Sequence, residues 1–132
     1  MAQAYDRTLA PLLFEPWDAQ LIDDNKPWMD TNVLDLACGT GVVTKELAKN
    51  VGPNGKITAL DFSSQMLRLA KVKCKEWINQ IDFIEGSADS IALPDDSVDT
   101  IVCQQFFPNK AAAAKEIFSV LKPKASAIIS NW

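Results

Sequence analysis

The sequence predicts an α/β fold built on an open parallel sheet. Short runs rich in β-branched residues alternate with longer segments whose apolar residues recur at helical spacing. The runs of strand length cover residues 32–37, 56–60, 81–85, 98–103 and 125–130. Because helical segments separate most of these runs, the strands should lie parallel, with the helices as crossovers.

Three helices are expected between the strands. Segments 42–50 and 63–77 each place apolar residues on one helical face, as a helix packed on a sheet does. The third helix falls in NKAAAAKEIFSVLKP, where Asn109 is a suitable N-cap and four alanines favour the helix. We expect this helix to end at Lys122 and Pro123, because proline cannot donate a backbone hydrogen bond.

Length and composition predict one domain. With 132 residues, 48% of them hydrophobic, the chain can bury one modest core. Residues 1–31 carry leucines near helical spacing, interrupted by prolines, and are expected to form an N-terminal helical cover. Residues 32–132 then form the ligand-binding core, in which 88–97 is a loop or short helix between the third and fourth strands.

The charge balance and the cysteines limit the kinds of binding partner and the cellular location that we expect. The chain has 13 basic and 17 acidic residues, a net charge of -4, which argues against nucleic acid. It shows neither a signal peptide nor an apolar run long enough to span a membrane. Three cysteines without C-x-x-C spacing argue against disulfides and against a zinc site. We therefore expect a cytoplasmic protein without metal that binds small molecules or proteins.

The stretch VLDLACGTGVV is the strongest candidate for a binding site. Gly39 and Gly41 follow a predicted strand and open a predicted helix, which is where doubly wound sheets bind nucleotide-like ligands. Gly39 would allow a sharp turn, and Gly41 would keep side chains away from the ligand. The alternative is a tight strand-to-helix turn with no ligand.

Two acids indicate which ligand the turn would receive. Asp61 lies 22 residues after Gly39, at the end of the second strand, where a carboxylate can accept both ribose hydroxyls. It could instead be an acid that stabilises a helix N-terminus. Asp35 would repel a pyrophosphate but suits a ligand that bears an ammonium and a sulfonium. Thr44 stands where a dinucleotide fingerprint has its third glycine, so S-adenosylmethionine is favoured over NAD.

Four successive stretches resemble the motifs of class I S-adenosylmethionine-dependent methyltransferases, closest to the ubiquinone/menaquinone-biosynthesis-like group. They are VLDLACGTG, ALDFSSQMLRLAK, FIEGSADSIALPDDSVDTIVCQQ and EIFSVLKP. The resemblance covers residues 33–132 and implies a Rossmann-like sheet of order 3-2-1-4-5. It implies methyl transfer from S-adenosylmethionine to a small-molecule acceptor. Relatives continue through two more strands, so a fragment or minimal core is expected.

The resemblance also implies a set of cofactor-binding residues. They are Asp35, Ala37, Cys38, Gly39, Gly41, Asp61, Phe62, Met66, Ser87, Ala88, Asp89 and Gln104. The members before Asp61 would line the methionine part, and Asp61 would hold the ribose. Phe62 and Met66 would pack near the adenine, although both could instead be core residues. Gln104 would lie near the transferable methyl, or be an ordinary loop amide.

The sequence departs from the family pattern beside the adenine. Ser87 replaces the acid that relatives commonly place after Gly86, and Asp89 could take its role. The chain has no histidine, so we assign no catalytic base. An acceptor that arrives as a phenolate or enolate would need none.

Two alternatives and an assembly prediction remain open. The chain could be a non-catalytic module that binds S-adenosylmethionine or S-adenosylhomocysteine, or an interaction module, or more distantly an NAD(P)-dependent oxidoreductase. The fifth strand would form an uncovered apolar edge. We therefore expect a homodimer joined through residues near Ile128 to Trp132.

Overall fold

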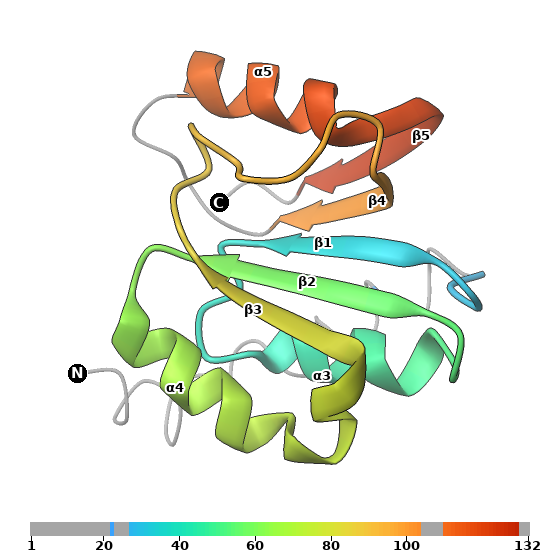
Figure 1. Cartoon of the computed structure of the whole chain (residues 1–132), viewed down its shortest axis with the longest axis vertical. Helices are drawn as coiled ribbons and strands as arrows, with labels where there is room; N and C mark the ends of the chain where they lie inside the picture. Colours follow the sequence, from blue (N-terminus) through green and yellow to red (C-terminus); the bar gives the residue numbers. More distant parts are fainter. Residues whose placement is uncertain (1–21, 23–26, 104–109, 130–132) are drawn as a thin grey trace.

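The computed structural model describes residue 22, residues 27–103 and residues 110–129. The elements, in chain order, are β1 (Asn32–Leu36), α3 (Val42–Asn50), β2 (Lys56–Asp61), α4 (Ser64–Lys73), the 3-10 helix η2 (Lys75–Gln80), β3 (Ile81–Glu85), β4 (Val98–Cys103), α5 (Lys110–Val120) and β5 (Leu121–Ile129). The strands form one parallel sheet of order β3-β2-β1-β4-β5, in which all arrows point the same way (Figure 1). This confirms the predicted fold class and strand order.

Two element boundaries differ from the prediction. Strand β5 begins at Leu121 rather than at 125, so α5 ends at Val120, before Pro123. The strand tolerates Pro123 because β5 lies at the sheet edge and its register with β4 shifts in this stretch. The helix expected over 63–77 is also divided. Helix α4 ends at Lys73, and Trp77 interrupts the following 3-10 segment with non-helical backbone angles.

Helices cover both faces of the sheet. Helices α3 and α4 lie on one face and α5 on the other (Figure 1). Neighbouring residues of β1 serve the two faces in turn: Val33 packs in the core beneath α3 and α4, whereas Leu34 and Leu36 pack in the core beneath α5. The same alternation places Asp35 on the α3/α4 face, so one strand contributes to both cores and to the candidate site.

The remaining predictions on organisation fall partly outside the described residues. Most of residues 1–31, which were expected to form an N-terminal helical cover, lie outside the described residues. Ile22 and Trp28 are described, and both are buried in the α3/α4 core. The Trp28 indole also donates a hydrogen bond to the Ile22 carbonyl. The segment 88–97 is a loop, one of the two forms expected. Within the described part of the chain, no helix is long and apolar enough to cross a bilayer.

Asp99 joins three strands at the amino-terminal end of the sheet. Its Oδ2 accepts a hydrogen bond from the Asn32 amide at 2.8 Å, and its Oδ1 accepts one from Lys122 Nζ at 2.9 Å. The Asn32 amide first and the Lys122 ammonium second lower the pKa of Asp99. The carboxylate therefore stabilises the fold at neutral pH, and this contribution is lost as the pH falls through the lowered pKa.

We expect Asp99→Asn to lower the free energy of unfolding by about 1 kcal/mol at pH 7, since the side chain is partly exposed. The difference between the variant and the unchanged protein should shrink below about pH 4, where an unfolded aspartate takes up its proton. Urea unfolding at several pH values measures it. Asp82→Asn, which removes an exposed pair with Lys56, is the control and should cost only a few tenths of a kcal/mol. A pH-independent effect of Asp99→Asn would contradict the interpretation.

Candidate functional site

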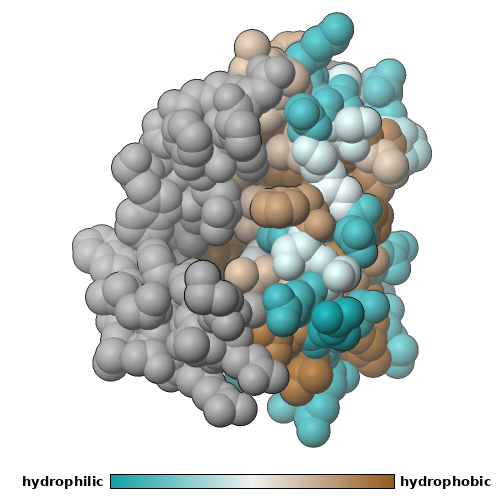
Figure 2. All heavy atoms as spheres, turned by 90° about the vertical axis from the view of Figure 1, so that its left-hand side faces the viewer, coloured by the Kyte–Doolittle hydropathy of each residue, from teal (hydrophilic) through white to brown (hydrophobic). Residues whose placement is uncertain are grey.

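The candidate site lies at the carboxyl ends of the strands. Helix α3 leaves β1 toward one face of the sheet, and α5 follows β4 on the other face. Neighbouring parallel strands whose connections diverge in this way leave a crevice, where α/β sheets bind ligands. Figure 2 looks onto this edge, and its described part carries apolar side chains interspersed with polar ones.

The glycine turn has an unusual backbone. Ala37, Gly39 and Gly41 all adopt positive φ, at 59°, 58° and 89°. The turn is held by hydrogen bonds from the Cys38 amide to the Leu60 carbonyl and from the Gly41 amide to the Cys38 carbonyl, at 2.9 and 3.1 Å. A positive φ at alanine is strained, so these contacts hold a conformation that the local sequence alone does not favour.

The two glycines have different roles, and this corrects the sequence interpretation of Gly41. A Cβ on Gly41 would meet Ala70 of α4, with the nearest atom at 2.9 Å, so Gly41 allows α3 and α4 to approach closely. A Cβ on Gly39 would meet no atom of the described residues within 4 Å. Gly39, rather than Gly41, is therefore the glycine that borders open space.

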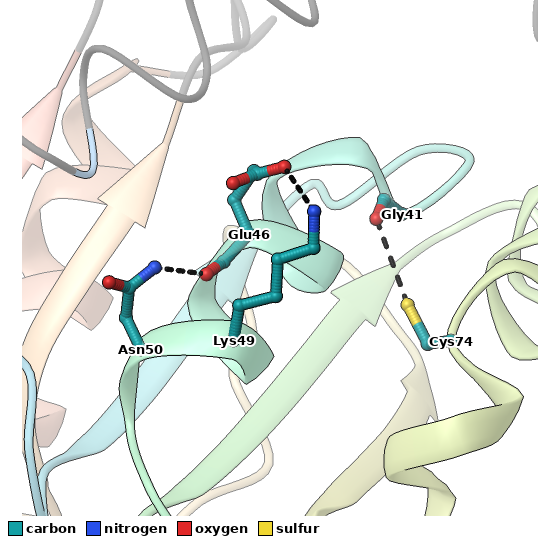
Figure 3. Close-up of polar contacts among 5 residues, drawn as sticks. All are labelled: Gly41, Glu46, Lys49, Asn50 and Cys74. Atoms are coloured by element: carbon teal, nitrogen blue, oxygen red, sulfur yellow. Dashed lines mark hydrogen bonds and ion pairs between the residues drawn. The ribbon is translucent and has the colours of Figure 1, made fainter.

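Polar contacts are present at both ends of helix α3 (Figure 3). At its start, Cys74 Sγ donates to the Gly41 carbonyl at 3.8 Å. At its end, Asn50 Nδ2 donates to the Glu46 carbonyl at 2.7 Å, and Lys49 pairs with the Glu46 carboxylate at 3.1 Å. The cation in the last turn also suits the helix dipole. The Cys74 contact connects the start of α3 to the end of α4, whereas the contacts of Glu46 stabilise the last turns of α3 itself.

Asp61 lies where the sequence predicted, at the end of β2. Its side chain is buried, and Oδ2 accepts a hydrogen bond from the Gly39 amide at 2.8 Å. Its Oδ1 accepts one from the Ser63 amide at 2.9 Å, at the N-cap of α4. The acid therefore occupies a helix N-terminus and touches the glycine turn at once. Each carboxylate oxygen can accept a further hydrogen bond, so a ribose contact is compatible with this geometry.

Asp35 is buried beneath the turn and has a partner that sequence reasoning missed. Thr44 Oγ1, in the first turn of α3, donates to Asp35 Oδ2 at 2.5 Å. Asp35 is 3% exposed and Thr44 is fully buried. Sequence reasoning treated Thr44 only as a missing glycine, although a hydroxyl nine residues after an acid was the signal available.

Burial and nearby carboxylates keep the two cysteines of the site protonated. Burial, followed by the charges of Asp35 and Asp61, raises the pKa of Cys38 far above its ordinary value. Burial, followed by the charge of Asp35, raises the pKa of Cys74 to about 11. Both side chains are therefore thiols at neutral pH, and the turn lies in a negative potential.

The residues expected beside the adenine are near the surface. Phe62 is 80% exposed, which excludes a place in the core, whereas Met66 is half-buried. Ser87 and Asp89 are exposed, and Ser87 Oγ donates to Asp89 Oδ1 at 2.5 Å. Ala88 packs against the α5-side core. Asp89 therefore lies beside Ser87, and its role as a substitute acid stays a prediction.

Two other residues complete the account of the site. Gln104 lies outside the described residues, so its predicted place near the methyl group cannot be compared.

Thr40, between the two glycines, was not singled out from the sequence. It is 2% exposed, and its hydroxyl has no hydrogen-bond partner among the residues that the structure describes. A buried hydroxyl without a partner is costly, and only its position within the glycine motif could have drawn attention to it.

Fold and site together define a Rossmann-like domain of the kind that binds nucleotide cofactors, with a glycine turn after β1 and an acid after β2. Residues 33–124 match the family described as "Methyltransferase domain". The chain belongs to this family. The match includes the turn and both acids.

Individual relatives agree with the family assignment. The chain is 36% identical over 126 residues to demethylmenaquinone methyltransferase of Lactococcus lactis, covering 90% of this chain and 50% of that protein. It is 33% identical over 129 residues to the Staphylococcus aureus enzyme of the same name, covering 93% and 53%. The chain thus spans about half the length of the curated relatives it matches.

A solved structure supports the same relationship. A SAM-dependent methyltransferase from Aquifex aeolicus superposes with a TM-score of 0.78 at 26% identity, over 87% of this chain and 63% of that one. These matches confirm the predicted relationship to S-adenosylmethionine-dependent methyltransferases and, with it, the expected cofactor of the family.

The corrected role of Gly41 gives a stability prediction. Gly41→Ala should lower the free energy of unfolding by about 2–4 kcal/mol, because it combines a left-handed backbone with a clash against Ala70. Gly39→Ala is the matched control: it has a similar φ but open space, and should cost only about 1–2 kcal/mol. Chemical denaturation compares them. Equal losses would show that the approach to Ala70 is unimportant.

Proposed function

We propose that this chain binds S-adenosylmethionine at the carboxyl ends of β1 and β2 and takes part in methyl transfer to a small-molecule acceptor. The observation that carries the proposal is the pairing of Gly39 with Asp61. The missing side chain of Gly39 leaves open space, and its amide is held by the Asp61 carboxylate at 2.8 Å. A ligand on this turn would meet bare backbone on one side and an acid on the other.

The chemistry of the site fits this cofactor. The buried acids Asp35 and Asp61 give the turn a negative potential, which favours a ligand with an ammonium and a sulfonium. Asp61 has the acceptor capacity that ribose hydroxyls need. The exposed ring of Phe62 directly follows Asp61, so it could cover an adenine. Met66, Ala88 and the pair formed by Ser87 and Asp89 are proposed to complete the adenine side, as the family resemblance implies.

The contribution of this chain to the reaction is binding and alignment. S-adenosylmethionine, when bound, supplies an electrophilic methyl on a sulfonium for in-line displacement. Ala37, Cys38, Gly39 and Gly41 are proposed to line the methionine part, and Gln104 to lie near the methyl. The protein holds the reacting groups in line and excludes water, which are the main needs of such a displacement.

The acceptor is proposed to be a quinol-type ring. The supporting observation is that the relatives named above are demethylmenaquinone methyltransferases. Such an acceptor can arrive as a phenolate or enolate and then needs no base from the protein. This agrees with a chain without histidine, in which the two thiols of the site are protonated.

A function other than methyl transfer on the same cofactor-binding fold is the second candidate. The [4+2]-cyclase SpnF shares the fold with a TM-score of 0.74 at 24% identity, over 83% of this chain and 41% of that one. The fold alone therefore does not define a reaction. Binding of an NAD-type cofactor is disfavoured, because Asp35 would repel a pyrophosphate and Thr44, its hydrogen-bond partner, replaces the third glycine of the dinucleotide pattern.

Calorimetric titration tests the proposed cofactor. The chain should bind S-adenosylmethionine and S-adenosylhomocysteine but not NAD. Asp61→Asn should weaken binding of both by about 1.5–3 kcal/mol, the scale of a hydrogen bond to a charged group. Asp82→Asn changes an exposed side chain on β3; it is the control and should leave the affinity for both ligands unchanged. Binding of NAD alone, or unchanged affinity in Asp61→Asn with normal folding, would contradict the proposed site.

A homodimer through β5 is proposed as well. Strand β5 lies at the sheet edge, and its stretch 125–129 has no charged residue. Antiparallel pairing of two copies about Ala127 would bring uncharged residues together, including the half-exposed Ile129. The rest of the predicted contact, 130–132, lies outside the described residues.

A cytoplasmic location is proposed from the three buried cysteine thiols.

Light scattering at increasing concentration tests the dimer. We expect twice the chain mass at high concentration, and Ile129→Lys should restore the monomer because an edge lysine opposes strand pairing. Phe118→Lys, on the exposed side of α5, serves as the control and should leave the dimer intact. A monomer at every concentration would rule the dimer out.

A further inference from the structure

A buried hydrogen bond connects α3 to the strand beneath the glycine turn. Thr44 Oγ1 donates to Asp35 Oδ2 at 2.5 Å, and both residues are almost completely inaccessible to water. Asp35 lies on the α3/α4 face of β1, next to a core that contains Val33 and Leu47. A carboxylate in such surroundings must be hydrogen-bonded, and its partners decide how it is oriented.

We propose that Thr44 is a positioning residue, which holds the Asp35 carboxylate in the orientation that receives the cationic amino end of the bound cofactor. This inference rests on the proposed function and deepens it. The β-branched side chain of Thr44 has few rotamers within a helix, so its hydroxyl direction is well defined. The hydroxyl contacts Oδ2 from the α3 side and so restricts the rotation of the carboxylate.

The charge of Asp35 acts on the turn as well as on the core. Burial is the first cause that raises the pKa of Cys38 and of Cys74, and the charge of Asp35 is the second. Cys38 lies within the turn, and Cys74 donates to the carbonyl of Gly41 in the same turn. Open space begins at Gly39, next to Cys38. The charge of the carboxylate that Thr44 contacts thus acts on Cys38, which directly precedes Gly39.

The position of Thr44 gives it a part in specificity. In the pattern G-x-G-x-x-G, Gly39 and Gly41 are followed by Thr44 where the third glycine would stand. A glycine there has no hydroxyl to orient an acid. The combination of Thr44 with Asp35 therefore favours an ammonium at this point and disfavours a pyrophosphate.

A comparison of two ligands separates this role from a purely structural one. The full chain is titrated with S-adenosylmethionine and with 5′-methylthioadenosine, which keeps the adenosine but lacks the amino acid end. Thr44→Val should weaken S-adenosylmethionine about tenfold, the scale of one hydrogen bond to a charged group, and leave methylthioadenosine within about twofold. Thr44→Ser, which keeps the hydroxyl, should restore S-adenosylmethionine binding. Thr58→Val, the same change on half-buried β2, is the matched control and should alter neither affinity.

A double-mutant cycle tests the connection to Asp35. If Thr44 acts through the carboxylate, Thr44→Val should add little to the loss caused by Asp35→Asn. Chemical denaturation verifies that each variant folds, and Thr44→Ala replaces Thr44→Val if the valine variant does not. Equal weakening of both ligands, or additive losses in the cycle, would overturn this inference alone. If the unchanged chain bound neither ligand, the proposed function would fail, and the inference with it.

Discussion

The Asp61 carboxylate is the contact on which the geometry of the candidate site depends. Its two oxygens accept the amides of Gly39 and Ser63, and its backbone carbonyl accepts the amide of Gly86 at 3.0 Å. The segments that follow β1, β2 and β3 therefore converge on one buried residue. Hydrogen bonds to a buried charge are costly to lose, so this convergence fixes the turn, the start of α4 and the end of β3 relative to one another.

A second constraint comes from the close approach of α3 and α4. Gly41 meets Ala70 without a side chain between them, and Cys74 donates to the Gly41 carbonyl. The same turn has a left-handed backbone, which is strained at Ala37. The strain is offset by contacts outside the turn. As a result, the amides and the open face of Gly39 are already in place before any ligand arrives, which lowers the entropic cost of binding.

Local patterns in the sequence were sufficient to predict the elements but not how they meet. Periodicity placed the strands and α3 because each pattern lies within one element. Strand order came from the family resemblance. The prediction that Gly41 keeps side chains away from the ligand was wrong. A side chain at Gly41 would meet Ala70, which lies 29 residues away, and no local pattern connects the two. The hydrogen bond of Thr44 to Asp35 was missed because the two side chains meet only when α3 folds back onto β1. The start of β5 was misplaced because Pro123 is tolerated only at an edge, which is a property of the whole sheet.

The described part of the site is equipped to bind and orient rather than to move protons. Asp61 accepts a hydrogen bond from the Gly39 amide and Asp35 accepts one from the Thr44 hydroxyl, so both acids hold the structure around the turn together. Cys38 is a thiol at neutral pH because burial and the two acids raise its pKa. The same negative charge that would attract a cationic cofactor thus suppresses the one nucleophile within the turn. An acceptor that arrives as a phenolate or enolate would suit such a site, as the proposed function implies.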